Sequence, residues 1–511
     1  MLARVIRHNT SGPVGGPAAG AATAASAAAR TLVERDLEVF WHPCARMRDY
    51  EDFPPLEVTA ARGARLVLAD GREVLDAISS WWCKSLGHGH PGVRARIEQQ
   101  LGRFEHVIAA NTTHPALVEL CERLLDMANG HFVLSPGPGP GVASGGGPRD
   151  GTRHFGKVFL ADNGSPAVEI ALKMALQAQQ QRGQGRRTRF ASLSGGYHGE
   201  TIATLSVGDL GLYADPYQPL MFPVTKLGPM PHRTGIADPL WHDAGPEWPA
   251  IEEALLSVEG TLAAVVYEPV LQAAGGMRFY SPDLLRRLRR FADAHGVYLI
   301  ADEIAAGMGR LGTMLAGQLA VTNSLDAMDE LGHHGVLPDF AVLSKGLTAG
   351  FLPLSAVLTT NEIFAHFEGE WVERRAFLHS NTHTGNALAI AAALGALDAY
   401  ATEGILEHVA TEGPRMLAAL TSVARRSPVL TQVRGLGMVA AVDLCAPGGG
   451  PLDPNARTGR RVFQEAVKRG ALLRPLGDTM YLFPPLNCPP GDLDAMVEIL
   501  ADSVAAVVAG A

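Results

Sequence analysis

Lys345 could do chemistry, because it ends the apolar run of AVLSKGL at residues 341–347. A lysine ammonium in a low-dielectric interior is compensated by an anion or gives up its proton. The lysine either extends its amine to solvent past a strand end, or it serves as a partly desolvated nucleophile. The second interpretation requires acidic and anion-binding groups elsewhere in the chain.

Asp302 and Glu303 end another apolar run, VYLIA at 297–301. A carboxylate at such a place must be paired with a cation or solvated. The residues that follow include GMGRLG at 307–312, which matches the GxGxxG pattern of dinucleotide-binding turns. In those turns the glycines follow the strand directly and open a helix, whereas here DEIAA intervenes, so this hypothesis is set aside.

A phosphate-binding turn is indicated where KVFLA at 157–161 leads into Asn163, Gly164 and Ser165. A helix with Pro166 in its first turn follows. Backbone amides at a helix N-terminus, together with the Ser165 hydroxyl, could hold a phosphate. The alternative is an ordinary capped helix.

Tyr197 and His198 lie in a glycine-flanked loop, SGGYHGET at 194–201, where an exposed aromatic ring could stack on a flat ligand. The alternative is an ordinary, partly buried tyrosine. Together with the strand-end Lys345 and Asp302 and the phosphate cradle, this ring matches the needs of pyridoxal phosphate. The amine would bind the aldehyde, and the carboxylate would keep the ring nitrogen protonated.

The elements around these residues alternate between apolar strands and helices, which is typical of an α/β domain with a mainly parallel sheet. Helical spacing occurs at 166–181 and at 281–296, where Ser281 is expected as the N-cap. Beyond residue 385 long helices are followed by short strands, which predicts a second, smaller α+β domain. Strands are expected at 65–70, 157–161, 189–193, 262–270, 297–301, 340–344, 354–360, 438–444, 471–476 and 480–485.

The predicted organisation begins with a disordered tail over 1–35 that is rich in Ala and Gly. Residues 36–85 would be the N-terminal part of the small domain, 86–385 the large cofactor-binding domain and 386–511 the rest of the small domain. The Pro- and Gly-rich stretch 135–151 and the polar stretch 323–335 are expected to be loop insertions.

The composition argues against nucleic-acid and membrane partners. The net charge is -9, whereas either partner would favour a basic patch. Five cysteines are scattered without a CxxC pair, so a reducing cytoplasm is expected. The histidines at 88 and 90 lack acidic or cysteine partners at ligand spacing, and no metal site is expected.

A series of short motifs, in one order along the chain, resembles the class III aminotransferases of pyridoxal-phosphate fold type I. The resemblance covers roughly residues 36–505. It rests on LGHGHP at 86–91, GS at 164–165, YHG at 197–199, EP at 268–269, ADEIAAGMGR at 301–310, SKG at 344–346 and VRGLGM at 433–438.

Four longer stretches resemble one branch of that class. This branch moves an amino group from S-adenosyl-L-methionine to 8-amino-7-oxononanoate, and so makes 7,8-diaminononanoate for biotin biosynthesis. The stretches are FWHP at 40–43, SSWWCK at 79–84, FLHSNTHTGN at 377–386 and LLRPLGDTMYLFPP at 472–485.

The resemblance implies the roles of the site residues. Lys345 would bind pyridoxal 5'-phosphate and shuttle protons, Asp302 would pair with the ring nitrogen, and Tyr197 would stack near the ring. Gly164, Ser165 and Glu268 would complete the cofactor site from the same subunit. Asn381 and Thr382 would reach the phosphate of the other subunit of a homodimer. Small-molecule substrates would meet Cys44, Trp81, Trp82, Tyr197, Lys345, Ser380 and Arg474, with Arg474 receiving a carboxylate.

Departures from the family pattern leave the amino donor open. Cys44 stands where a tyrosine is common, Glu200 where an aspartate is usual, and Ser380 and Asn381 replace a glycine and a proline. The alternatives are another class III enzyme, acting on an ω-amino acid or a diamine or using lysine as the donor. A non-catalytic protein of the same fold is a remote alternative.

Overall fold

The computed structural model describes residues 30–130, 154–320 and 336–509. The chain divides into two units between Glu57 and Val58. The expected insertions at 135–151 and 323–335 lie outside the described residues, as does most of the expected tail.

The first unit contains the helix α1, Leu32–Val39, and the short 3-10 helix η1, Met47–Tyr50. Thr31 and Glu34 form a capping box, in which each side chain accepts a hydrogen bond from the other residue's backbone amide. The predicted tail over 1–35 is therefore too long, because this cap begins a helix at Leu32.

The second unit is built around a seven-stranded sheet in the order β4–β12–β11–β10–β7–β5–β6. β12 runs antiparallel to its neighbours β4 and β11, and the pairs from β11 to β6 are parallel. The predicted α/β class with a mainly parallel sheet is confirmed. The strands are β4 Phe155–Ala161, β5 Arg189–Leu193, β6 Val224–Leu227, β7 Leu262–Tyr267, β10 Tyr298–Asp302, β11 Phe340–Leu343 and β12 Ser355–Thr360.

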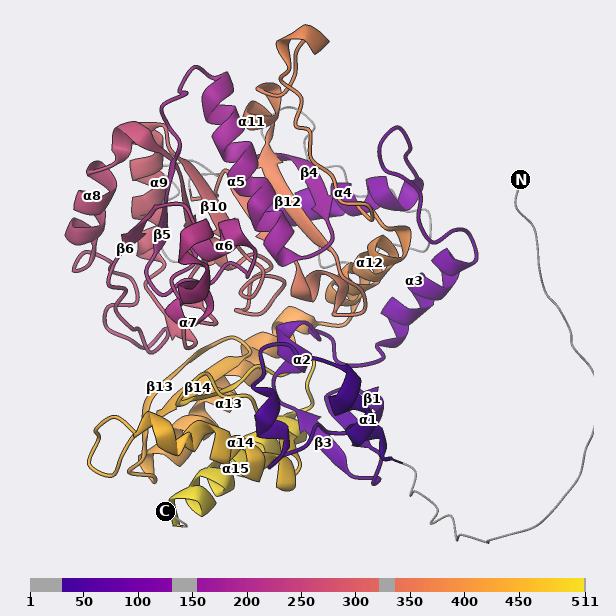
Figure 1. The fold of residues 1–511 in the computed structure, drawn as a ribbon, viewed down its shortest axis with the longest axis vertical. Helices are drawn as coiled ribbons and strands as arrows, with labels where there is room; N and C mark the ends of the chain where they lie inside the picture. Colours follow the sequence, from indigo (N-terminus) through magenta and orange to yellow (C-terminus); the bar gives the residue numbers. More distant parts are fainter. Residues whose placement is uncertain (1–29, 131–153, 321–335, 510–511) are drawn as a thin grey trace, which may run out of the picture. The chain divides into compact units, whose positions relative to one another are not determined.

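Helices cover both faces of this sheet, which explains why its strands are apolar throughout. Along β10, Ile300 packs on one face in the cluster that contains α5, whereas Leu299 packs on the other face with α9. Figure 1 shows α5 lying across the sheet. The helices of this part are α5 Gly164–Gln181, α6 Ile202–Val207, α7 Gly211–Ala214, α8 Trp248–Leu256, α9 Asp283–His295 and α11 Asn361–Ala365.

The start of α9 differs from the sequence prediction. The N-cap position is Pro282 rather than Ser281, and proline makes no side-chain capping hydrogen bond. The Ser281 hydroxyl donates to the carbonyl of Trp241 at 2.8 Å, and it accepts from the Asp283 amide at 3.2 Å. Ser281 thus ties the helix start to the chain before α8. Gly296 ends the helix at φ 62°, in the left-handed region.

Two smaller sheets join the segment after Val58 to the C-terminal part. One has the order β1–β2–β3–β15, in which β15 pairs in parallel with β3, and the other has the order β13–β14–β16. The strand expected at 471–476 is much shorter, because only Ala471–Leu472 pairs. The predicted domain boundaries stay a prediction. The strands are β1 Val58–Arg62, β2 Arg65–Leu68, β3 Glu73–Asp76, β13 Leu430–Leu436, β14 Val439–Leu444, β15 Ala471–Leu472 and β16 Thr479–Leu482, with β8 Leu271–Gln272 and β9 Arg278–Phe279 as a separate hairpin.

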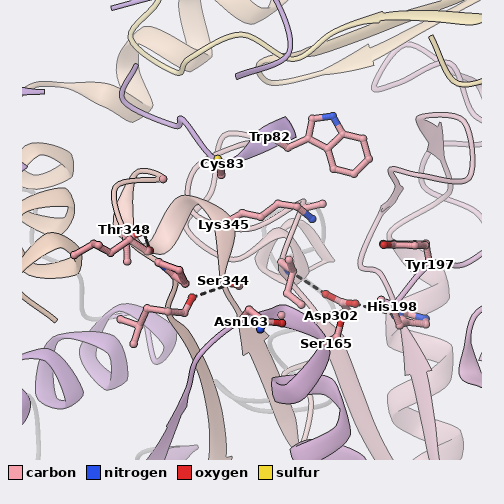
Figure 2. Close-up of a pocket in the computed structure, with 18 of the residues that line it drawn as sticks. Trp82, Cys83, Asn163, Ser165, Tyr197, His198, Asp302, Ser344, Lys345 and Thr348 are labelled. Carbon is pink, nitrogen blue, oxygen red and sulfur yellow. Dashed lines mark hydrogen bonds and ion pairs between the residues drawn. The ribbon is translucent and has the colours of Figure 1, made fainter. Parts of the chain in front are cut away.

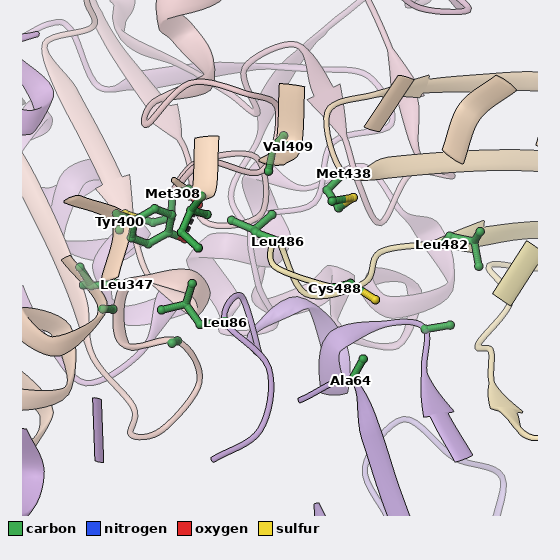
Figure 3. Packing of buried hydrophobic residues seen from close by; sticks show 14 of the residues in the cluster. Ala64, Leu86, Met308, Leu347, Tyr400, Val409, Met438, Leu482, Leu486 and Cys488 are labelled. Atoms are coloured by element: carbon green, nitrogen blue, oxygen red, sulfur yellow. Dashed lines mark hydrogen bonds between the residues drawn. The ribbon is translucent and has the colours of Figure 1, made fainter. Parts of the chain in front are cut away.

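A large hydrophobic cluster packs these sheets against α12, α13 and α15. Figure 3 shows Met308, Leu347 and Tyr400 together in it, and Tyr400 also donates a hydrogen bond to the Met308 carbonyl at 2.6 Å. Each fully buried side chain of this size contributes about 1.5–3 kcal/mol. The remaining helices are α2 Ser79–Trp82, α3 Pro91–Leu101, α4 Pro115–Ala128, α12 Ala387–Thr402, α13 Ile405–Arg425, α14 Thr458–Lys468 and α15 Pro490–Ala509.

None of the helices in the described segments could cross a membrane singly by length and composition. The pair α12 and α13 passes that test only in combination, with a bend of 72° between its members.

Candidate active site

Lys345 follows the end of β11, with only Ser344 between them, and lines a cavity of about 410 Å³. Its backbone has a φ of 30°, which turns the chain sharply after the strand. In Figure 2 its side chain extends between Trp82 and the carboxylate of Asp302. Burial lowers the pKa of Lys345 from its ordinary value, and the nearby Asp302 and Glu268 act in the opposite direction. The amine therefore loses its proton more readily than a lysine in water.

Asp302 is the last residue of β10 and is 4% exposed. One carboxylate oxygen lies 2.8 Å from Nδ1 of His198, and the other accepts from the Ile304 amide at 3.1 Å. His198 is also buried, and within the described part of the chain its Nε2 has no hydrogen-bond partner. Two firm contacts thus orient the Asp302 carboxylate in the cavity.

The start of α5 lies on the wall of this cavity, where its first amides could hold an anion. Asn163, Gly164 and Ser165 line it, and Asn163, at the N-cap, makes no side-chain capping hydrogen bond. The first amides of a helix have no intrahelical acceptor, and they carry the positive end of its dipole. Gly199 leaves room for this turn, because a Cβ there would lie 2.1 Å from Oγ of Ser165.

Glu268 holds the loop that carries Tyr197. Its two carboxylate oxygens accept hydrogen bonds from the amides of Tyr197 at 3.0 Å and Ala273 at 3.1 Å. Burial raises the pKa of Glu268 to about 7, although the nearby His198 and the two amides favour the charged form. The Tyr197 hydroxyl donates to Glu200 at 2.9 Å, which fixes the ring at the cavity wall.

These groups match the aldehyde, the ring nitrogen and the phosphate of pyridoxal phosphate. The Lys345 amine suits an aldehyde, the Asp302 carboxylate suits a protonated ring nitrogen, and the N-terminus of α5 suits a phosphate. The residues present therefore fit this cofactor.

A second cavity, of about 640 Å³, adjoins the first and shares Trp82, Tyr197 and Lys345 with it. Trp81 and Arg474 line it, and the guanidinium carbon of Arg474 lies 4.2 Å from the centre of a Trp81 ring. A guanidinium on an aromatic face gains a cation–π contact, and its planar fork suits a carboxylate. The Lys345 amine lies 5.0 Å from the centre of a Trp82 ring, so each tryptophan ring is close to a basic side chain of the site.

The tandem tryptophans lie on an unusual turn. Ser79, Ser80, Trp81 and Trp82 have φ values of 49°, 45°, 70° and 72°, so four consecutive residues with side chains are left-handed. This conformation costs roughly 1–2 kcal/mol per residue. Strain of this kind persists only where surrounding contacts hold it.

Ser380, Asn381 and Thr382, which are predicted to lie at a dimer interface, line neither cavity within this chain. Ser380 and Thr382 are exposed, and the Thr382 carbonyl accepts from Nε2 of His106 at 3.1 Å. The backbone amide of Asn381 donates a hydrogen bond to the Thr384 hydroxyl. The expected reach of Asn381 and Thr382 into a partner's site stays a prediction, as does the role of Cys44, which belongs to the first unit.

Two residues of the site were not assigned from the sequence. His198 was noted beside Tyr197 but received no role, and Asn163 was treated only as part of the turn. The YHG motif places His198 on the loop, yet its partner Asp302 is 104 residues away in the chain.

Comparisons with known proteins agree with this geometry. Residues 47–504 match the family model for aminotransferase class III. The adenosylmethionine-8-amino-7-oxononanoate aminotransferase of Nitratidesulfovibrio vulgaris is 37% identical over 489 residues, which are 94% of this chain and 83% of that protein. The protein of the same name from Synechococcus elongatus is 38% identical over 470 residues, or 90% and 97% of the two chains.

The fold is also similar to the solved structures of transaminases. The crystal structure of adenosylmethionine-8-amino-7-oxononanoate aminotransferase from Methanocaldococcus jannaschii has a TM-score of 0.79 at 27% identity, covering 93% of this chain and 98% of that one. An amine transaminase from an uncultivated Pseudomonas species, in its form with bound pyridoxal phosphate, has a TM-score of 0.78 at 31% identity, with 92% and 98% covered.

Proposed function

Because the chain belongs to the class III aminotransferases, we propose that it transfers an amino group from S-adenosyl-L-methionine to 8-amino-7-oxononanoate. The chain is a pyridoxal-phosphate-dependent aminotransferase of fold type I. The product would be 7,8-diaminononanoate, a precursor in biotin biosynthesis. One observation carries the choice of substrate: Arg474 rests on Trp81 in a cavity that also reaches Lys345.

The residues of the first cavity would hold the cofactor and move the proton. When bound, pyridoxal phosphate accepts the electron pair that remains as the substrate loses its α-proton. Lys345 would bind the aldehyde and, as a neutral amine, carry that proton. Asp302, oriented by His198, would keep the ring nitrogen protonated. Gly164 and Ser165 would hold the phosphate at the start of α5.

The residues of the second cavity would recognise the substrates, which bind in turn. Trp81 and Trp82 offer apolar walls for an alkyl chain, and Arg474 can form a bidentate pair with a carboxylate. Ser380 and Cys44 are proposed as further substrate contacts on the strength of the family resemblance alone.

The assay of the purified protein with both substrates tests this proposal. We expect 7,8-diaminononanoate to form, as measured by mass spectrometry, and its absence would refute the proposed acceptor. Replacing S-adenosyl-L-methionine by lysine tests the donor. A Cys44→Tyr variant is the matched control, because it restores the family's usual residue and should change kcat/KM for the donor more than for the acceptor.

A second candidate is an amine transaminase of wider specificity, which the 31% identity to the Pseudomonas amine transaminase favours. Such an enzyme would accept diamines or ω-amino acids with kcat/KM values comparable to that for 8-amino-7-oxononanoate. The ratio of these values decides between the two candidates.

A homodimer with shared active sites and a cytoplasmic location complete the proposal. The exposed Thr382 and the half-buried Asn381 support the dimer, since neither residue lines a cavity of its own chain. Light scattering measures the molar mass of the protein in solution, which should be that of two chains. Mixing Lys345→Ala with a Thr382→Ala variant should restore activity, because one site of each mixed dimer would then be intact.

A further inference from the structure

The turn that carries the tandem tryptophans is anchored at Asp76, the last residue of β3. Asp76 is completely buried, and it accepts hydrogen bonds from the Ser80 amide at 2.9 Å and the Ser80 hydroxyl at 2.7 Å. Nε2 of His88 lies 2.9 Å from the same carboxylate. Burial opposes ionisation, yet these hydrogen bonds from His88 and Ser80 leave the pKa of Asp76 below its ordinary value. A charged, buried acceptor therefore holds the second residue of the left-handed turn.

Trp82 has anchors of its own on the far side of the turn. Its Nε1 donates to the Tyr481 hydroxyl at 3.1 Å, and its ring packs 5.6 Å from that of Phe483. The Ser79 hydroxyl donates to the carbonyl of Phe483 at 2.7 Å. These contacts fix Ser79 and Trp82 without the help of Asp76.

Trp81, in contrast to the buried Trp82, is 40% exposed. Ser80 precedes it and is tied to Asp76, and the Ser80 carbonyl accepts from Sγ of Cys83 at 3.2 Å. The direction of the Trp81 ring therefore depends on the φ value of Ser80. That ring is in turn the surface against which Arg474 rests.

We propose that Asp76 is a positioning residue for the substrate carboxylate. Through Ser80 it holds the left-handed turn, the turn sets the Trp81 ring, and the ring orients the guanidinium of Arg474. The inference rests on the proposed function for the role of Arg474, and it adds a residue that touches neither substrate nor cofactor.

The experiment measures the binding of nonanoate, a simple nine-carbon carboxylate, to the holoenzyme by calorimetry. Ser80→Ala removes the hydroxyl and keeps a side chain in the left-handed region, whereas Ser80→Gly removes the hydroxyl and tolerates that region. We expect Ser80→Ala to raise the Kd about tenfold, and Ser80→Gly to raise it less. Asp76→Asn should raise it at least as much as Ser80→Ala, because it removes the charge and replaces one of the two acceptor oxygens by a donor.

A double-mutant cycle then tests the route of the effect. In an Arg474→Ala background, Ser80→Ala should leave the Kd of nonanoate nearly unchanged, because the group that it orients is gone. Ser79→Ala is the matched control, since its hydroxyl lies in the same turn but bonds to Phe483. Its effect should be the same with and without Arg474.

Three results would overturn the inference. The first is that the wild-type holoenzyme does not bind nonanoate. The second is that Ser80→Ala changes the Kd equally in the wild-type and the Arg474→Ala proteins. The third is that Ser80→Ala loses the bound cofactor, which would mean a general structural role. Absorbance of the lysine-bound cofactor detects the last. If the cycle showed coupling between Ser80 and Arg474 but the protein made no diamino product, the proposed function would be refuted and the positioning role of Asp76 would remain.

Discussion

The two cavities that meet at Lys345 are built in different ways. The cofactor cavity collects side chains from the carboxyl ends of β10 and β11 and from the start of α5, where regular elements direct them. The second cavity, which is proposed to bind the substrates, depends on a left-handed turn and on Arg474, which lies just beyond the two-residue strand β15. Regular elements thus position Lys345 and Asp302, whereas irregular backbone shapes the cavity that is proposed to recognise the substrates.

The electrostatics of the two cavities also differ. Around Lys345 the polar groups are buried, and burial shifts the pKa values of Lys345 downward and Glu268 upward. Arg474 is instead in contact with an aromatic face in a cavity that includes exposed residues. Changes in the first cavity should therefore act mainly on kcat, and changes in the second mainly on KM.

Lys345→Ala should have the largest effect, because it removes both the amine that binds the cofactor and the proton carrier. We expect kcat to fall by at least about 10³-fold. Steady-state assay with 8-amino-7-oxononanoate measures the loss, and mass spectrometry of reduced protein shows whether the cofactor is still attached. A variant that kept wild-type turnover would remove Lys345 from the mechanism.

Asp302→Asn should come next, because a neutral amide cannot hold a protonated ring nitrogen as a carboxylate does. We expect kcat to fall by about 10²-fold, with a small change in KM. His198→Asn is the companion variant, and it should cause a smaller loss in the same direction. If KM rose instead while kcat held, the proposed division between the cavities would be wrong.

Arg474→Ala tests the other cavity. Loss of a charge-assisted, bidentate partner should lower kcat/KM for the keto acid by about 10–100-fold, chiefly through KM. Arg474→Lys keeps the charge but not the fork, and it should recover part of the loss. Single-turnover reaction with the donor alone provides the control, and an equal loss there would contradict a role confined to the acceptor.

The smallest effect concerns stability and pH. Glu268 has a folded-state pKa near 7, against an ordinary value of 4.5. Its protonated form is favoured in the folded protein, so its stabilising contribution is complete below pH 4.5 and is lost as the pH rises toward 7. Glu268→Gln should flatten this decline by about 1–2 kcal/mol, as measured by urea unfolding of the apoprotein between pH 5 and 8. An unchanged slope would show that Glu268 ionises normally.

The regular part of the fold was accessible from the sequence. The strand predicted at 189–193 matches β5, and the run at 340–344 matches β11 to within one residue. Both strands are apolar throughout because helices cover both faces of the sheet. Asp302 and Lys345 could also be placed near each other from the sequence, because parallel strands have their carboxyl ends at the same edge of a sheet.

The irregular parts were not accessible. The strand expected at 471–476 stops after Leu472, so the backbone at Arg474 is not set by sheet pairing. Ser79–Trp82 adopt a conformation that local preference disfavours in every one of the four residues, and no spacing pattern reveals it. The capping box at Thr31 and Glu34 fits a sequence pattern that predicts a helix start, but the Ala- and Gly-rich composition of the preceding residues led to a predicted tail that extended through it.

By itself, the sequence determined the kind of protein, through motifs in one order, strand ends that carry Lys345 and Asp302, and a turn before α5 that is predicted to bind phosphate. These depend on local patterns and on the simple rule that parallel strands end together. Only the tertiary structure decided how His198 meets Asp302, how Asp76 holds Ser80, and how Trp82 reaches Tyr481, 399 residues away. Such contacts depend on long-range packing, which also supplies the free energy that keeps a left-handed turn in place.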